Sequence, residues 1–100
     1  MESEYELINN EDQNRYEFHI DGYVPRVEYI LTKDHKIYLT HTEVPRELEG
    51  KGIASALVKQ VLSEVEKSGR ELVPLCPYVA QYIKRHPEWT KLVAKEFGLS

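Results

Sequence analysis

The chain has 100 residues, of which 41% are hydrophobic and 10% aromatic, and these proportions indicate a folded globular protein rather than a disordered segment. A chain of this length has room for one hydrophobic core, so we expect a single domain over residues 1–100. The formal net charge is −4, which disfavours nucleic acid as a partner because such proteins need a strong basic field.

Disulfides, metal sites and membrane segments are not indicated. Cys76 is the only cysteine, which excludes an internal disulfide and a metal site with several cysteines. The histidines His19, His35, His41 and His86 lack metal-ligand spacing, so we expect no metal. Because the first residues are acidic and no apolar run approaches about 20 residues, we expect no signal peptide, no membrane span and a cytoplasmic location.

The first half of the chain has the pattern of β-strands. Tyr16, Phe18 and Ile20 alternate with polar residues, which is typical of a half-buried strand. Strands are expected at residues 5–8, 16–20, 27–32 and 37–44, with a loop at 9–12 and turns at 21–22 and 33–36. Since the links between these strands are short, we expect an antiparallel meander.

The hydrophobic period changes to that of a helix at Gly52. Apolar residues then recur every three or four positions and form one continuous face, made of Ile53, Leu57, Val58, Val61, Leu62 and Val65. Ser68 and Gly69 follow as a helix stop, because glycine readily adopts the left-handed conformation of a C-terminal cap. This helix is the clearest element that the sequence predicts.

Elements after this helix complete the expected fold. A strand at 71–75, reached through a helix, should pair in parallel with the strand at 37–44. Pro77 suits the first turn of another helix, and a terminal helix at 89–97 should end at Gly98. The expected class is α/β of the α+β type, with a mostly antiparallel sheet, one parallel strand pair and the helices in the second half.

A glycine pair lies where the strand at 37–44 gives way to the long helix. Gly50 and Gly52 allow close approach to the backbone, and a helix N-terminus attracts phosphate. A flexible loop without a ligand remains the alternative. Ser55 at the third glycine position argues against a Rossmann fingerprint, and the pattern of a P-loop is missing.

The segment 44–57, followed by a long amphipathic helix, resembles motif A of the GNAT superfamily of N-acetyltransferases, with its pattern [QR]-x-x-G-x-[GA]. The resemblance implies that the loop amides bind the pyrophosphate of the cosubstrate acetyl-CoA and that the preceding strand pairs with the pantetheine arm. The implied coenzyme-binding residues are Thr42, Glu43, Val44, Arg46, Glu49, Gly50, Lys51, Gly52, Ile53 and Ala54.

Two further segments, 41–45 and 76–84, resemble a small subfamily of about 100 residues, the YjdJ-type GNAT-like proteins. The resemblance extends from about Tyr5 to Leu92 and implies a minimal, truncated GNAT domain. Its fourth and fifth strands would be parallel, and its helices would follow the motif A loop. The acceptor half of larger GNAT enzymes is nearly missing, which leaves a cleft open to a partner protein or a small amine.

This sequence departs from the superfamily pattern at two acidic residues. Glu47 occupies a position where the superfamily usually has Gln or Arg. Glu49 occupies the position before the first glycine, where the superfamily often has Arg. Carboxylates repel an anionic pyrophosphate, although salt screens exposed charges. Arg46 and Lys51 partly offset them, so we expect coenzyme binding of modest affinity.

Cys76 is the first candidate for chemistry. It precedes Pro77 and so lies at a helix N-terminus, a position that favours the thiolate form. The resemblance places it beside the thioester, where the fourth and fifth strands diverge. Cys76 is a nucleophile that takes the acetyl group, a residue that lines the pocket, or a buried structural cysteine.

His41 is the second catalytic candidate. If Ile37 and Leu39 face the core, alternation places His41 on the same face, where its imidazole can take a proton from an amine. A histidine that only forms a hydrogen bond within the sheet is the alternative, and Glu43 is the competing base. Many enzymes of the superfamily use a tyrosine as the general acid, but Lys84 occupies the corresponding position here. The basic residues 84–86 are expected to form a solvated turn rather than to bind phosphate.

The function expected from these residues is that of an acetyl-CoA-binding protein of the GNAT type. An N-acetyltransferase with an unknown amine acceptor is the first hypothesis. A non-catalytic acetyl-CoA-binding module or sensor is the alternative.

Overall fold

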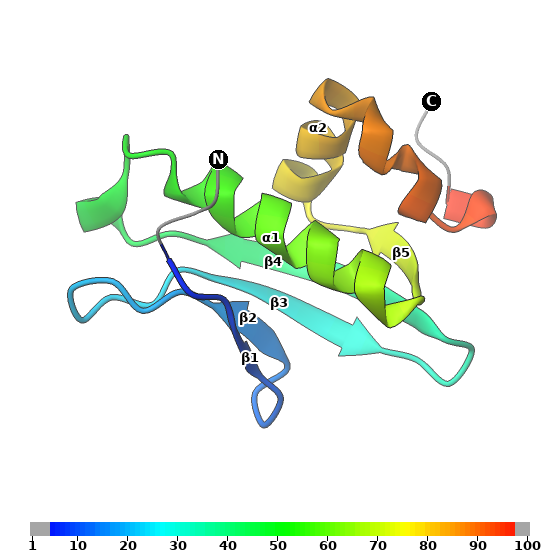
Figure 1. Ribbon diagram of the computed structural model, residues 1–100, viewed down its shortest axis with the longest axis horizontal. Helices are drawn as coiled ribbons and strands as arrows, with labels where there is room; N and C mark the ends of the chain where they lie inside the picture. Colours follow the sequence, from blue (N-terminus) through cyan, green and yellow to red (C-terminus); the bar gives the residue numbers. More distant parts are fainter. Residues whose placement is uncertain (1–4, 98–100) are drawn as a thin grey trace.

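The computed structural model describes residues 5–97 of the chain. One sheet has the strand order β1-β2-β3-β4-β5, formed by β1 Ile8–Asn10, β2 Arg15–Glu17, β3 Arg26–Leu31, β4 Lys36–Glu43 and β5 Glu71–Pro74. Neighbouring strands are antiparallel from β1 to β4, whereas β4 and β5 are parallel (Figure 1). The predicted α+β fold with one parallel pair is therefore confirmed.

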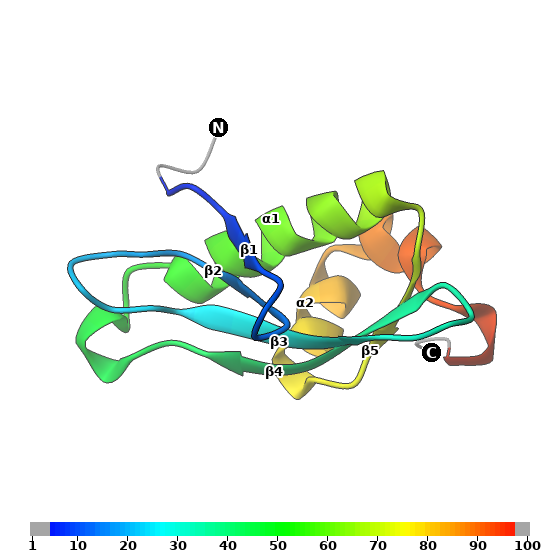
Figure 2. The same ribbon diagram turned by 90° about the horizontal axis from the view of Figure 1, so that it is seen from below.

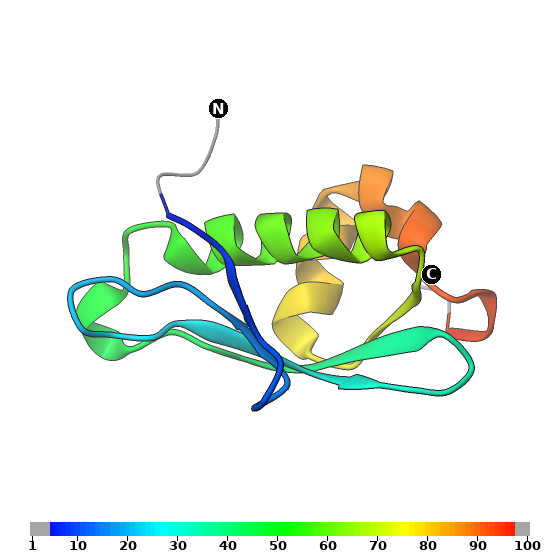
Figure 3. The same ribbon diagram turned by 60° about the horizontal axis from the view of Figure 1, so that its bottom comes forward.

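The long helix α1, Ile53–Ser68, connects β4 to β5 and lies over the sheet (Figure 3). All six apolar residues of its predicted face are buried. Gly69 ends the helix with a φ of 75°, and its N–H donates to the carbonyl of Glu66 at 3.2 Å. Both the helix and its stop are as the sequence predicted.

A second helix, α2 Pro77–Arg85, packs beside α1 and completes the core. Its residues Val79, Tyr82 and Ile83 are buried in one cluster with the apolar face of α1 and with the inward side chains of β3 and β4. This arrangement brings the first turns of both helices near the end of β4, where the candidate site lies.

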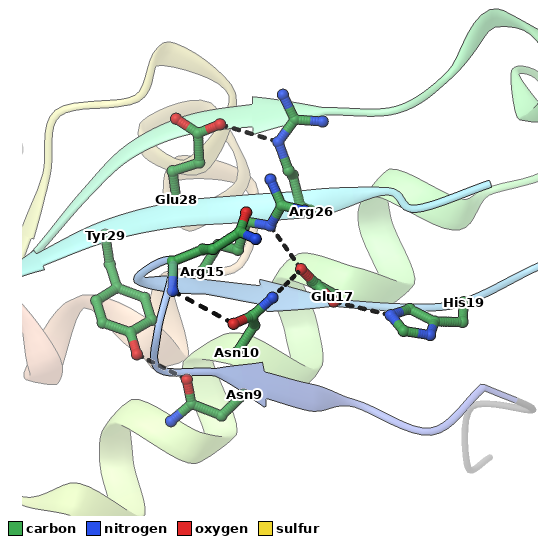
Figure 4. Close-up of polar contacts among 9 residues, drawn as sticks. Asn9, Asn10, Arg15, Glu17, His19, Arg26, Glu28 and Tyr29 are labelled. Carbon is green, nitrogen blue, oxygen red and sulfur yellow. Dashed lines mark hydrogen bonds and ion pairs between the residues drawn. The ribbon is translucent and has the colours of Figure 1, made fainter.

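The first strand lies further along the chain than predicted, because residues 9–10 belong to β1 and not to a loop. Asn9 pairs with Tyr16, and Asn10 pairs with Arg15. Asparagine is a poor strand former, but here its side chains gain hydrogen bonds (Figure 4). Asn9 accepts from the Tyr29 hydroxyl at 2.6 Å, and Asn10 donates to Glu17 at 2.9 Å. These contacts outweigh the local preference.

The predicted terminal α-helix at 89–97 is wrong. Two 3-10 helices take its place, η2 Pro87–Leu92 and η3 Lys95–Phe97. Between them, Val93 pairs with Leu72 of β5, and the Ala94 N–H donates to the Leu72 carbonyl at 2.9 Å. A continuous helix would break this strand-like contact. The predicted end at Gly98 lies outside the described residues.

Candidate functional site

Strands β4 and β5 diverge halfway along β4. Their parallel pairing ends where Leu39 faces Pro74, a residue that has no N–H to continue a ladder. The Cys76 N–H then donates to the Leu39 carbonyl at 2.9 Å. Among residues 5–97, the last part of β4 pairs only with β3, so one backbone edge of that segment is left for another partner.

A β-bulge at Thr40 changes which residues of β4 face the core. His41 lies opposite Glu28 and Leu39 lies opposite Tyr29, so Thr40 is the extra residue. An extra residue inverts the alternation that follows it. The side chain of His41 is 51% exposed, and the expectation that it shares the face of Leu39 is wrong.

The same bulge turns Thr42 toward the core and toward Cys76. Thr42 lies opposite the fully buried Val27, and its Oγ1 is 3.3 Å from the Cys76 Sγ. Cys76 is the residue before α2, as predicted, and is only 4% exposed. The thiol therefore lies behind Thr42 at the point where the strands diverge.

The segment after β4 folds back before α1 begins (Figure 2). A short 3-10 helix, η1 Arg46–Leu48, anchors it through the buried Leu48. Gly50 and Gly52 follow with φ values of 82° and 74°, in the left-handed region that favours glycine. A Cβ at either glycine would meet no atom within 4 Å, so backbone conformation and not crowding requires glycine here.

Helix α1 begins at this loop without a side-chain cap. Gly52 is the N-cap residue and offers no side-chain acceptor to the first-turn amides. Uncapped amides and the helix dipole together favour an anion at this position. The helix start that the sequence predicts after Gly52 is thus present, and phosphate binding there stays a prediction.

A hollow of about 410 Å³ lies between this loop, the end of β4 and the start of α2. We call it the loop hollow. It is lined by Thr42, Glu43, Val44, Leu48, Glu49, Gly50, Gly52, Ile53, Ala54, Ser55 and Tyr78. The predicted coenzyme-binding residues therefore lie together around one cavity, apart from Arg46 and Lys51, which do not line it.

Three lining residues were not predicted as site residues. Leu48 is an apolar anchor within the predicted segment, and Ser55 lies in the first turn of α1, directly after Ala54. Tyr78 comes from α2, and only the packing of α2 against the sheet brings it to the loop. The position of Ser55 in the first turn of the predicted helix, directly after Ala54, could have indicated it, whereas no local signal points to Tyr78.

Of the two predicted bases, only Glu43 reaches the loop hollow. Glu43 lines the hollow, and its Oε1 is 3.0 Å from the Nε2 of His41. His41 itself lies outside the lining. Arg46 and Lys51 form no ion pair with another residue of the range 5–97, which leaves both positive charges available to an anion.

Within the described range, no three His, Cys, Asp or Glu side chains are grouped so that they could hold a metal ion. The helices of this range are all too short or too polar to cross a membrane.

Comparison with known proteins relates the chain to one family. A family model described as GCN5-related N-acetyl-transferase matches residues 15–92. Protein NATD1 of Xenopus tropicalis is 32% identical over 82 residues, which are 76% of this chain and 73% of that protein. The NMR solution structure of a GCN5-like protein from Staphylococcus aureus has a TM-score of 0.72, covering 98% of this chain and 93% of that one at 20% identity. This last likeness concerns the fold.

Proposed function

This chain belongs to the GCN5-related N-acetyltransferase family, and we propose that it binds acetyl-CoA in the loop hollow and transfers the acetyl group to an amine. The observation that carries the proposal is the position of the hollow between the uncapped start of α1 and the unpaired edge of β4. The α1 amides attract a pyrophosphate, and the free edge of β4 can bond to the amides of a pantetheine arm as an added strand would.

The residues around the hollow fit such a ligand. Its volume of about 410 Å³ is within the range of small-molecule sites, and the space above Gly50 and Gly52 is open. Glu43 and Glu49 line the hollow and oppose an anion, while Arg46 and Lys51 lie close by in the sequence. We therefore expect binding of modest affinity at physiological salt.

Glu43 is the base that we favour, since it lines the hollow and His41 does not. An amine must lose a proton before its nitrogen attacks a thioester carbonyl, and a carboxylate at the rim can accept it. His41, 3.0 Å from Glu43, would then orient the carboxylate. We expect Glu43→Gln to lower kcat about a hundredfold or more, and His41→Asn to lower it less. Equal losses in both variants, measured by CoA release, would contradict this order.

Cys76 has two possible roles in this reaction. As a nucleophile, its sulfur would take the acetyl group while the bond to the CoA sulfur breaks, and the amine would later displace it. As a wall residue, it would only fill space behind Thr42, consistent with its burial. Incubation with acetyl-CoA followed by intact-mass measurement distinguishes them. No added acetyl mass, together with full activity of Cys76→Ser, removes the nucleophile.

Calorimetric titration with acetyl-CoA, followed by CoA release in the presence of a panel of amines, tests the whole proposal. We expect saturable binding and release of CoA that depends on the amine. No heat and no NMR shift change at millimolar acetyl-CoA would overturn binding. Saturable binding without release for any amine would overturn transfer and would favour a binding module or sensor.

A further inference from the structure

A second cavity, of about 430 Å³, lies at the end of α1 that is remote from the loop hollow. We call it the tyrosine cavity. Its lining combines two tyrosines, apolar side chains and both signs of charge, and includes Glu11, Tyr16, Tyr29, Leu31, Ile37 and Arg70. The two spaces share no lining residue. Since the 16 residues of α1 extend over about 24 Å, they are separate sites.

The hydroxyl group of Tyr16 is open to a ligand in this cavity. Tyr16 is only 7% exposed, and its hydroxyl has no hydrogen-bond partner among residues 5–97. Its neighbour Tyr29, with ring centroids 5.1 Å apart, differs because it donates to Asn9 (Figure 4). In the same range, every buried side-chain nitrogen or oxygen that is closed off from solvent has a partner. The unpartnered hydroxyl of Tyr16 is therefore reached from the cavity that this residue lines.

Opposite charges lie on two sides of Tyr16. Glu11 belongs to the turn between β1 and β2. Arg70 lies across the sheet, where its Nη1 donates to the carbonyls of Thr32 at 3.4 Å and Lys36 at 3.5 Å. Strands β2 and β3 run between these two places, so the two charges are held apart. Neither Glu11 nor Arg70 forms an ion pair with another residue of the described range.

The state of the Tyr16 hydroxyl follows from the same surroundings. Burial is the main cause that raises the pKa of Tyr16 to about 12. The neighbouring Tyr29 and the charges of Glu64 and Glu11 add to the rise, and Arg70 acts against it. The hydroxyl is thus neutral at physiological pH and can donate to a carboxylate. A guanidinium binds a carboxylate through parallel hydrogen bonds, so Arg70 and Tyr16 suit the same acidic group.

We propose that the tyrosine cavity binds a small zwitterion of the amino-carboxylate class, whose carboxylate and protonated amine lie at opposite ends of a short apolar chain. Arg70 and the hydroxyl of Tyr16 bind the carboxylate, and Glu11 binds the amine. The methylene groups between them pack against Tyr29 and the buried Ile37. The volume of the cavity is within the range of small-molecule sites. This site is independent of the acetyl-CoA site proposed above.

NMR titration of the full chain with 6-aminohexanoate, without acetyl-CoA and at about 0.15 M salt, tests the assignment. We expect saturable shifts of the amide signals of Ser68 and Arg70 with a Kd of about 1 mM, and no shifts at Gly50 and Gly52. Hexylamine lacks the carboxylate and should bind about tenfold more weakly. Hexanoate lacks the amine and should lose about threefold, because Glu11 is exposed. Norleucine, an isomer with both charges at one end, should also bind more weakly.

Two variants test the residues that bind the carboxylate. Arg70→Gln should weaken 6-aminohexanoate about tenfold and leave hexylamine unaffected. Lys67→Gln, at an exposed lysine near the end of α1 that does not line the cavity, should leave the affinity unchanged. Tyr16→Phe keeps the ring and removes a hydroxyl without a partner, so it should leave Tm unchanged and weaken binding about fivefold. Tyr38→Phe, whose ring lies against Phe97 outside the cavity, should change neither.

Several results would overturn the assignment. These are the lack of a saturable shift up to about 10 mM 6-aminohexanoate, equal affinity for norleucine, hexylamine or hexanoate, and shifts at Gly50 and Gly52 in place of Ser68 and Arg70. Unchanged affinity in either Arg70→Gln or Tyr16→Phe would also overturn it. Because acetyl-CoA is left out of the titration, each of these results leaves the proposed function intact. Failure of acetyl-CoA to bind would likewise leave this assignment intact.

Discussion

Gly52 combines two roles at a single residue, since it begins α1 with a φ of 74° and lines the loop hollow. An alanine Cβ there would meet no protein atom, but it would occupy space in which a phosphate approaches the amides. We expect Gly52→Ala to lower stability by roughly 1 kcal/mol, because a Cβ disfavours the left-handed region. Acetyl-CoA binding should weaken by about tenfold, the effect of losing hydrogen bonds to a charged group; calorimetry measures it.

Gly22 offers a matched control for this prediction. It has a similar φ of 82° and equally open surroundings, but it lies in the turn after β2. Gly22→Ala should therefore cost similar stability and leave the affinity for acetyl-CoA unchanged. If both variants weaken binding equally, the effect of Gly52 comes from stability and not from the site.

Glu17 shows how a charged residue of a predicted polar face becomes buried. The carboxylate is only 3% exposed and is surrounded by Asn10, Arg15 and His19 (Figure 4). Burial by itself would raise the pKa of Glu17, but hydrogen bonds from His19, Arg15 and Asn10 outweigh it and lower the pKa to about 2. The ionised form is thus bound more tightly by the folded protein than by the unfolded chain.

This shift predicts an acid-dependent loss of stability. The folded pKa of Glu17 lies below the ordinary value of 4.5, so its contribution is complete above about pH 4.5 and is lost as the pH falls to about 2. The difference corresponds to roughly 3 kcal/mol. Urea denaturation of the unaltered chain should show this loss, whereas Glu17→Gln should be less stable at pH 7 and change less toward acid. Glu28→Gln, at a half-buried glutamate of the same face, should keep the acid dependence.

At the scale of elements, the bulge in β4 decides the composition of the site. One extra residue at Thr40 brings Thr42 to Cys76 and turns His41 to the other face. The strand pattern of residues 37–44 could be read from the sequence, but strict alternation assigned the wrong face to His41. A bulge depends on the pairing with β3, and the sequence of β4 alone contains no sign of it.

Helix α1 is the element on which the site depends most, because its first turn forms one side of the loop hollow. Leu62 is fully buried two turns further on. We expect Leu62→Ala to reduce the free energy of unfolding by about 2–5 kcal/mol through lost contacts and a residual cavity. Denaturant unfolding measures this. Lys59→Ala on the exposed face of α1 should change it by less than about 0.5 kcal/mol; a similar loss in both would contradict the packing argument.

At the scale of the whole molecule, ligand binding and folding should be coupled. The loop hollow uses residues from β4, α1 and α2, which come together only in the folded chain. Acetyl-CoA at about ten times its Kd should stabilise the fold by roughly 1.4 kcal/mol, which corresponds to a rise of about 6–11 °C in Tm for a domain of this size. A thermal melt that does not change with saturating ligand would contradict binding to the native state.

The sequence by itself determined the elements that follow a local period. Apolar spacing predicted α1, the glycines predicted its start and its stop, and the crossover through α1 predicted the parallel pairing of β4 and β5. The same local signals predicted most of the residues that line the loop hollow, because these residues are close together in the chain and adjoin one helix N-terminus.

Only the tertiary structure decided the features that depend on partners distant in sequence. Pairing with β3 produced the bulge that separates His41 from Thr42, and pairing with β5 replaced the terminal helix by two 3-10 helices. Side-chain contacts across the sheet drew Asn9 and Asn10 into β1 and buried Glu17, while packing of α2 brought Tyr78 to the hollow. The physical reason is common to all of them: hydrogen bonds and contacts across the fold outweigh local conformational preferences that are each worth less than about 1 kcal/mol.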